Sequence, residues 1–315
     1  MARSLVEKYK EPSEFTEKQL SVFWLPDEIK VEKDIQDILT NFTESEKHGV
    51  ITTLKLFTKY EDFAGEEYWG GRFKRIFDGS EFRRMATAFS MFETCVHLPF
   101  YRKINELLNL NTDEFYESYI DNPILKERME FVDECVSCDD DLLSLGVFSM
   151  IEGAILYSLF AFLKHFQANG KNKLNNVVRG INFSVRDENL HSVAGAWCFK
   201  HRLSTMPHDT EYLINLETKI TKAANTLYEH ECHIVDMLFE NGGMDGITPT
   251  QLKHFVQSRI NQCMIELGYK KIFDVKYNPI AEWFYDNINS FTFNDFFAGI
   301  GNQYNRNWDS TAFTW

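Results

Sequence analysis

The sequence reads Glu93-Thr94-Cys95-Val96-His97 at one point and Arg186-Asp187-Glu188-Asn189-Leu190-His191 in the second half of the chain. On an α-helix, residues three or four positions apart share a face, so each stretch aims one carboxylate and one imidazole at the same point. A helix bundle that turns two such stretches inward, with a glutamate from each of two other helices, builds a dinuclear carboxylate metal site. The pattern therefore predicts a helix bundle around a metal centre.

Two further glutamates lie in apolar stretches and complete this set. Glu152 is followed by Gly153-Ala154-Ile155-Leu156, and Glu61 ends a run that starts at Leu54. A single Glu/His pair is common on solvated helix faces, but a carboxylate inside an apolar helix must be paired or bound to metal. Four carboxylates and two imidazoles suit two divalent cations, and an oxygen-rich set favours iron or manganese. The predicted ligands are Glu61, Glu93, His97, Glu152, Glu188 and His191.

Composition limits the class of protein. The chain has 315 residues, 44% of them hydrophobic, with 28 Phe but only 7 Pro and 16 Gly, which favours helices over a loop-rich β fold. The net charge of −14 argues against nucleic-acid binding. The N-terminus is charged, and the strongly apolar stretch 156–163 is too short to span a bilayer. We therefore expect a cytoplasmic protein with no membrane partner.

Hydrophobic periodicity and capping residues predict long helices and no β-hairpin. Residues 1–30 look irregular, with a helix starting near Asp27, and Thr112 is expected to begin another helix. The other expected helices span about 45–63, 81–108, 142–167, 174–200, 211–241 and 250–268.

Two residues beside the predicted ligands could assist them. Asp187 precedes Glu188 and could accept a proton from a ligand imidazole, although it could equally pair with Arg186. Tyr101 lies one turn after His97, so its ring should lie close to the metals, unless it is an ordinary core tyrosine.

These motifs resemble those of the small, radical-generating β subunit of class I ribonucleotide reductase, and the resemblance runs from about Trp24 to Tyr304. Ser184 to His191 is similar to the family's R-D-E-x-x-H helix, and Glu152 matches its glutamate on the preceding helix. His97 and Tyr101 match the family's H-x-x-x-Y, whose tyrosine holds the radical. Trp24 resembles the tryptophan on the family's electron-transfer route, near the equivalent of Asp187.

The chain departs from the family pattern at three places. The family usually has E-x-x-H before the radical tyrosine, whereas Glu93 and His97 are one residue further apart, which a π-bulge could absorb. Alignment on His97 makes Tyr101 the radical residue, and alignment on Glu93 would make it Phe100. The first ligand is typically Asp, so Asp62 rivals Glu61. The tail after Tyr304 contains no tyrosine for a relay, although Trp308 or Trp315 could substitute.

The resemblance implies an all-α, ferritin-like helix bundle with additional helices over residues 1–300, and a tail at 301–315 that docks the large subunit. It implies a homodimer that is the β subunit of ribonucleoside-diphosphate reductase, which supplies deoxyribonucleotides for DNA replication. A dinuclear metal centre, Fe/Fe first and Mn/Mn or Mn/Fe as alternatives, would oxidise Tyr101, and Asp187 and Trp24 would carry the oxidising equivalent to the large subunit.

Other functions fit a helical dimetal protein. A ferritin-like ferroxidase would need no docking tail, and a di-iron oxidase would need a channel for its own substrate. A helical protein that has lost its metals would not be expected to keep the full ligand set.

Overall fold

This computed structural model describes residues 5–275 and 277–289. Throughout these residues, stretches with helical apolar periodicity form helices. Beyond helices, the described part contains only an isolated bridge between Met244 and Ile247, so the all-α expectation is confirmed. The helices are α1 Glu11–Ser21, α2 Glu44–Phe63, α3 Phe73–Ile76, α4 Ser80–Phe92, α5 Leu98–Leu107, α6 Asp113–Asp121, α7 Pro123–Ser137, α8 Asp141–Met150, α9 Tyr157–Lys164, α10 Asn175–Thr205, α11 Thr210–Leu238, α12 Pro249–Leu267 and α13 Pro279–Asn289.

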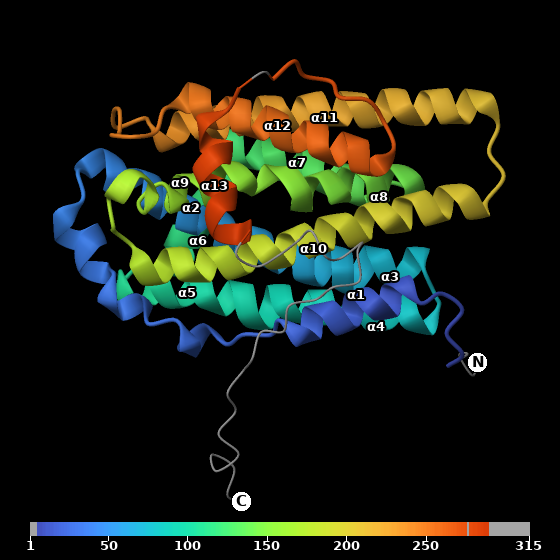
Figure 1. The fold of residues 1–315 in the computed structure, drawn as a ribbon, viewed down its shortest axis with the longest axis horizontal. Coiled ribbons are helices and arrows are strands. Elements are labelled where there is room, and N and C mark those ends of the chain that lie inside the picture. The colour runs from blue at the N-terminus through green and yellow to red at the C-terminus, as the bar shows by residue number, and fades with distance from the viewer. Residues whose placement is uncertain (1–4, 276, 290–315) are drawn as a thin grey trace, which may run out of the picture.

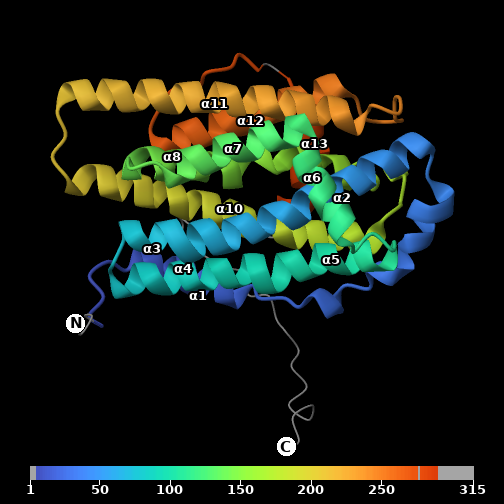
Figure 2. The same ribbon diagram turned by 180° about the vertical axis from the view of Figure 1, so that it is seen from behind.

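The long helix α10 runs through the middle of the bundle (Figure 1). It packs against α8, α9 and α12 on one side and against α1 on the other. Seen from behind, α2 and α5 lie side by side and α6 crosses α2 (Figure 2). This arrangement encloses the middle of α10 and gives the motif Arg186–His191 a buried environment on several sides.

Polar caps fix several helix starts where the sequence predicted them. The Thr112 side chain accepts a hydrogen bond from the Phe115 amide at the start of α6, and Asp140 accepts one from Leu143 at the start of α8. Thr43 and Glu46 form a reciprocal capping box before α2. These side chains satisfy amides that have no partner within the helix, which is why these boundaries could be read from local sequence.

The N-terminal expectations were wrong in two places. Glu11–Ser21 is a helix, with Pro12 in its first turn, where proline is well tolerated. No α-helix starts near Asp27; the helical segments within residues 26–41 are short, with 3₁₀ turns at Pro26–Glu28 and Val31–Lys33 and a π turn at Asp37–Asn41. The reason is tertiary: the Asp34 carboxylate accepts hydrogen bonds from the Asn176 and Val177 amides at 2.6 and 2.7 Å, so this segment caps α10.

Two predicted helices are interrupted by π-helical turns. The stretch expected at 81–108 consists of α4, the turn Glu93–His97 and α5. The stretch expected at 142–167 consists of α8, the turn Ile151–Ile155 and α9. A further π segment, Ala64–Arg72, extends α2. Such turns are rare and often mark functional sites. These three carry a predicted ligand or lie close to one in the chain, whereas a fourth π segment, Asp37–Asn41, does not.

The helical run Asp141–Gly170 is long and apolar enough to cross a membrane by composition, and longer than the apolar stretch expected from the sequence. Its most apolar window is completely buried inside the bundle. It is therefore the core helix of a fold consistent with a soluble protein. The tail expected to dock a partner, 301–315, lies outside the described residues.

Candidate metal centre

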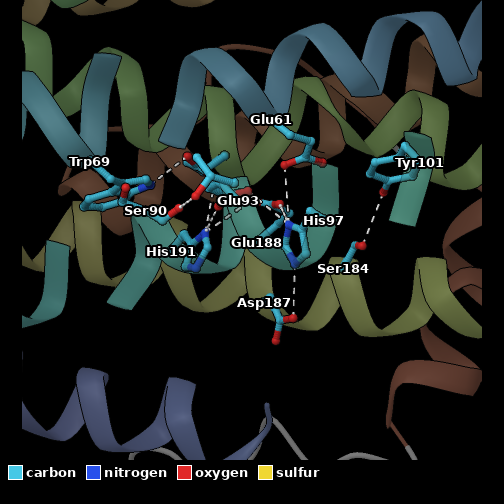
Figure 3. Close-up of polar contacts among 12 residues, drawn as sticks. Glu61, Trp69, Ser90, Glu93, His97, Tyr101, Ser184, Asp187, Glu188 and His191 are labelled. Atoms are coloured by element: carbon cyan, nitrogen blue, oxygen red, sulfur yellow. Dashed lines mark hydrogen bonds and ion pairs between the residues drawn. The ribbon is translucent and has the colours of Figure 1, made fainter. Parts of the chain in front are cut away.

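All six predicted ligands meet in the interior of the bundle (Figure 3). Glu61 comes from α2, Glu93 and His97 from the π turn after α4, and Glu152 from the π turn after α8. Glu188 and His191 come from α10. Each of these side chains is no more than 1% exposed, so the cluster is sealed from solvent.

The six residues form two overlapping groups, and in each the potential ligand atoms lie within 4.8 Å of one another. One group is Glu61, Glu93, His97 and Glu188; the other is Glu93, Glu152, Glu188 and His191. Glu93 and Glu188 belong to both. The arrangement therefore offers two neighbouring cation sites with one imidazole each, a terminal glutamate each and two shared carboxylates, which is the dinuclear carboxylate geometry of helix bundles.

The π turn Glu93–His97 explains how the longer Glu/His spacing still works. An α-helical turn brings residues three and four apart together, and the wider π turn accommodates one extra residue. Glu93 Oε2 lies 3.0 Å from His97 Nδ1, while Glu93 Oε1 lies 2.6 Å from His191 Nδ1. One carboxylate thus faces both imidazoles, as a shared ligand must.

Both histidines point the same nitrogen into the cluster. His97 Nδ1 lies 3.4 Å from Glu61 and 3.1 Å from Glu188, and His191 Nδ1 lies 3.4 Å from Glu188. The opposite nitrogens bond to residues outside the ligand set: His97 Nε2 lies 3.2 Å from Asp187 Oδ2, and His191 Nε2 lies 3.0 Å from Gln19 Oε1. Such partners fix the tautomer and ring orientation of a metal-binding histidine, leaving Nδ1 free to bind.

The rival first ligands Glu61 and Asp62 lie in different environments. Glu61 is fully buried and lies in the cluster. Asp62 is exposed and lines a surface cavity of about 360 Å³ with Lys59, Arg102 and Asp113. Consecutive helical residues point about 100° apart, so only one of the two can face the bundle interior.

Many polar atoms of the cluster make no hydrogen bond, although ion-pair distances join several of them to one another, such as Glu93 Oε1 and His191 Nδ1. This observation tests whether the cluster fits metal. Both carboxylate oxygens of Glu61 and Glu188, one oxygen each of Glu93 and Glu152, and His191 Nδ1 are buried without a hydrogen bond among the described residues. Buried polar atoms are normally satisfied, and an unsatisfied group suggests an absent ion or water. Carboxylate oxygens and imidazole nitrogens converging on two points match iron or manganese in ligand type.

Charge balance without metal depends on protons. Burial raises the pKa values of Glu61 and Glu152 well above the usual glutamate value, and the neighbouring carboxylates raise these pKa values further. Burial disfavours charged imidazoles, but the adjacent carboxylates raise the pKa of His97 and His191 well above the usual histidine value. Burial also opposes ionisation of Glu93 and Glu188. The two histidines nonetheless lower the pKa of Glu93, and Glu152 and then the two histidines lower the pKa of Glu188, although Glu93 raises it.

Asp187 links the cluster to an indole outside it. Its Oδ2 accepts a hydrogen bond from Trp24 Nε1 at 2.9 Å and lies 3.2 Å from His97 Nε2. The planes of the Trp24 and His97 rings are inclined by 29°, with centroids 5.9 Å apart. Arg186 also binds Asp187, through Oδ1, so both alternatives weighed for Asp187 occur together. Arg186 additionally binds the Val22 carbonyl, which anchors the segment that carries Trp24.

Tyr101 lies at one end of the cluster in an apolar pocket (Figure 3). Its ring stacks on Phe57 at a centroid distance of 4.6 Å, and Phe160 stacks on the far side of Phe57 at 4.9 Å. The rival position, Phe100, packs against Trp24, at a centroid distance of 5.5 Å, and against Gly180. Tyr101 is fully buried, and that burial raises the pKa of its phenol well above the usual value.

Three contacts of the site were missed from the sequence. Gln19 holds His191, Trp69 Nε1 donates a hydrogen bond to Glu152 Oε1 at 3.1 Å, and Ser184 pairs with Tyr101. Gln19 lies on a helix that was not predicted, and Trp69 on a π segment that was not predicted. Ser184 lies one turn before Glu188, and this spacing on the motif helix could have identified it.

Comparisons with known proteins agree with this geometry. A family model described as "Ribonucleotide reductase, small chain" matches residues 5–279. A ribonucleoside-diphosphate reductase subunit beta from Halalkalibacterium halodurans is 26% identical over 299 residues, covering 90% of this chain and 83% of the relative. One from Bacillus subtilis is 23% identical over 304 residues, covering 93% and 88%.

A solved structure of similar fold is the dimanganese(II) NrdF of Streptococcus sanguinis. It has a TM-score of 0.77 and 21% identity, and the alignment covers 90% of this chain and 98% of that one. The likeness supports the ferritin-like arrangement of the helices.

Proposed function

The chain belongs to the family of ribonucleotide reductase small chains, and we propose that its six-residue cluster holds two metal ions that oxidise Tyr101 to a radical. The chain is the β subunit of a ribonucleoside-diphosphate reductase, an oxidoreductase, as its family and the names of its relatives indicate. The observation that carries the proposed mechanism is the convergence of four carboxylates and two imidazoles, with many unsatisfied atoms, in a sealed interior.

Glu61 and His97 would hold one ion, Glu152 and His191 the other, and Glu93 and Glu188 would bridge them. When bound, the metal pair supplies a strong oxidant by reaction with O₂ or with an oxidant from a partner. The protein's own contribution is orientation and exclusion of water. Asp187 and Gln19 fix the two imidazoles, and Phe57 walls the phenol of Tyr101 off from solvent, so that a reactive radical would persist.

Trp24 and Asp187 would carry the oxidising equivalent out of the site. The hydrogen bonds from Trp24 and His97 to the same oxygen of Asp187 form a continuous connection between the cluster and a residue outside it. Asp187 has a pKa below its usual value although burial opposes this, because Arg186 and His97 favour its charged form. It therefore remains an acceptor for both donors at neutral pH.

The metal pair we propose is Fe/Fe, with Mn/Mn and Mn/Fe as the alternatives. An oxygen-rich set with one imidazole per ion suits iron and manganese alike, so ligand chemistry restricts the choice to these two metals. Reconstitution with each metal separates the three pairs.

Family membership implies a dimer and a large-subunit partner. We propose a homodimer in the cytoplasm that docks its large subunit through residues 301–315, where Trp308 and Trp315 are candidate relay or anchor residues. The net charge of −14 fits a protein partner rather than a nucleic acid.

A ferritin-like ferroxidase or a di-iron oxidase is the alternative. The contact that disfavours it is Trp24–Asp187–His97, because a ferroxidase does not need an oriented indole hydrogen-bonded toward its metal site. Large-subunit dependence separates these functions: ribonucleotide reduction should require both subunits, whereas ferroxidase activity would be complete without the large subunit.

The test of the mechanism is metal analysis combined with electron paramagnetic resonance after aerobic reconstitution with Fe(II), with and without Mn(II). We expect about two metals per chain and a tyrosyl radical signal. Tyr101→Phe should abolish this signal, and adding Phe100→Tyr to that variant should not restore it. Two metals without a tyrosyl signal would indicate a heterometal pair that stores the oxidising equivalent itself. Full activity of Tyr101→Phe would refute the radical role.

A further inference from the structure

The phenol of Tyr101 bonds to a serine and not to any of the predicted ligands in the described part of the chain. Tyr101 Oη donates to Ser184 Oγ at 3.3 Å, and both side chains are fully buried (Figure 3). A hydroxyl carries one donor and two acceptor positions, so Ser184 can satisfy a phenol either as acceptor or, after rotation, as donor.

This partner distinguishes Tyr101 from other buried tyrosines. The phenol oxygens of Tyr60, Tyr68 and Tyr157 are buried without a hydrogen bond among the described residues. Tyr60 is next to Glu61 in the chain, so closeness in sequence to a candidate ligand does not by itself provide a partner. The Ser184 hydroxyl faces the tyrosine for which we propose a redox role, so its position calls for an explanation that is specific to Tyr101.

The backbone holds Ser184 in a fixed relation to the metal cluster. It lies on α10, one helical turn before Glu188 and three residues before Asp187. The rings that surround the phenol, Phe57 and Phe100, offer no acceptor that competes with the serine. The phenol is consequently oriented by a single polar contact carried on the same helix as two candidate ligands.

We propose that Ser184 is the positioning residue of the radical tyrosine: its hydroxyl accepts the hydrogen bond of the Tyr101 phenol and, after oxidation, turns to donate one to the phenoxyl oxygen. In this oxidation the metal pair, when bound, would take one electron from Tyr101, and the phenolic proton would turn away from Ser184 to the Glu61 carboxylate, whose oxygens have no hydrogen bond among the described residues. Ser184 would keep its own proton throughout. The second half of the proposal rests on the proposed function, because it requires a radical at Tyr101.

The first half can be tested without metal. In metal-free protein labelled with [¹³Cζ]tyrosine, Tyr101→Phe identifies the Tyr101 resonance. We expect Ser184→Ala to shift that resonance and Ser184→Thr, which keeps a hydroxyl, to leave it close to the wild-type position. Ser149→Ala is the matched control, because it removes a buried hydroxyl whose one hydrogen bond within the described residues is to the Ser192 carbonyl. An unchanged Tyr101 resonance in a folded Ser184→Ala protein would overturn the proposal, whatever the metal chemistry.

The second half is tested on the loaded protein by electron–nuclear double resonance in H₂O and D₂O. We expect an exchangeable proton coupling on the tyrosyl radical that Ser184→Ala abolishes, Ser184→Thr retains and Ser149→Ala leaves unchanged. Loss of the coupling should also raise the largest g value of the radical. A coupling that persists in Ser184→Ala contradicts the proposal, whereas absence of any tyrosyl signal in wild type contradicts the proposed function and leaves the metal-free experiment to decide the resting hydrogen bond.

Discussion

Loading the site with two divalent ions should release about four protons per chain at pH 7. The pKa shifts run upward at Glu61, Glu152, His97 and His191 and downward at Glu93 and Glu188. From these directions we expect the metal-free cluster to hold four protons, one on each of the first four residues. The two imidazolium charges then balance the two carboxylates. If all four carboxylates and both neutral imidazoles bind the two ions, as proposed, the ions would replace the four protons without changing the net charge.

The sign of the pH dependence follows from this exchange. Because binding releases protons, metal affinity should rise with pH, and the logarithm of the overall binding constant should increase by about four for each pH unit near neutrality. The measurement is anaerobic calorimetric titration with Mn(II), which avoids oxidation, in several buffers of different ionisation enthalpy. The slope of the observed enthalpy against the buffer ionisation enthalpy gives the number of protons released.

Two neighbouring substitutions make the experiment specific. Glu61→Gln removes one of the protons at issue and should lower the number released, whereas Asp62→Asn, at an exposed carboxylate one residue later, should not change it. Release of one proton or none in the wild-type protein would show that the buried carboxylates are already ionised without metal, and would refute the charge balance described above.

Three further predictions concern the relay, the packing and the core. Trp24→Phe removes the hydrogen-bond donor to Asp187. We expect the tyrosyl signal to persist while the rate of ribonucleotide reduction with the large subunit falls at least about tenfold. An equal loss of the tyrosyl signal and of ribonucleotide reduction would place Trp24 in radical formation instead. Gly153→Ala would bring a methyl group to 2.2 Å from Ser192 Oγ and 2.5 Å from Cys263 Sγ, so it should displace Glu152 and lower the metal content below two per chain, as measured by metal analysis; a normal content would show that the π turn can yield. Lys164 is buried, and this lowers its pKa to about 7. Between about pH 7 and 10.5 the unfolded chain therefore carries a proton on this lysine that the folded chain lacks. The free energy of unfolding should rise with pH across this window, by at most about 5 kcal/mol at about 1.4 kcal/mol per pKa unit. Lys164→Met should flatten that rise in urea unfolding at pH 7 and 9.5, and an equal rise in the variant would contradict the assignment.

Much of the fold was predictable because helix formation is largely local. Apolar periodicity and side-chain caps such as Thr112 and Asp140 depend on neighbours within one turn, and the predicted helix boundaries that rest on them agree with the structure. The prediction for residues 26–41 was wrong because a distant partner determines the conformation of this segment: Asp34 caps α10. Local sequence contains no information about such a contact.

The candidate site divides in the same way. Glu93 with His97 and Glu188 with His191 lie within single turns, so their shared face followed from the sequence, and their metal binding stays a prediction until metal is measured. The resemblance to the family added Trp24 and the radical role of Tyr101, whose place near the cluster followed from its spacing to His97. Gln19 and Trp69 approach the cluster from a helix and a π segment that the sequence pattern did not predict, and no spacing rule connects them to His191 or Glu152.

The sequence by itself determined the helical class, the two Glu/His faces and five of the six candidate ligands, with Glu61 or Asp62 as the sixth. These depend on the period of the helix and on the high cost of burying an unpaired carboxylate. Only the tertiary structure decided which carboxylates are shared, that Glu61 rather than Asp62 faces the cluster, and that Ser184 faces the phenol of Tyr101. Those choices depend on how helices that are distant in the chain are rotated against one another, and rotation is fixed by the packing of the whole core.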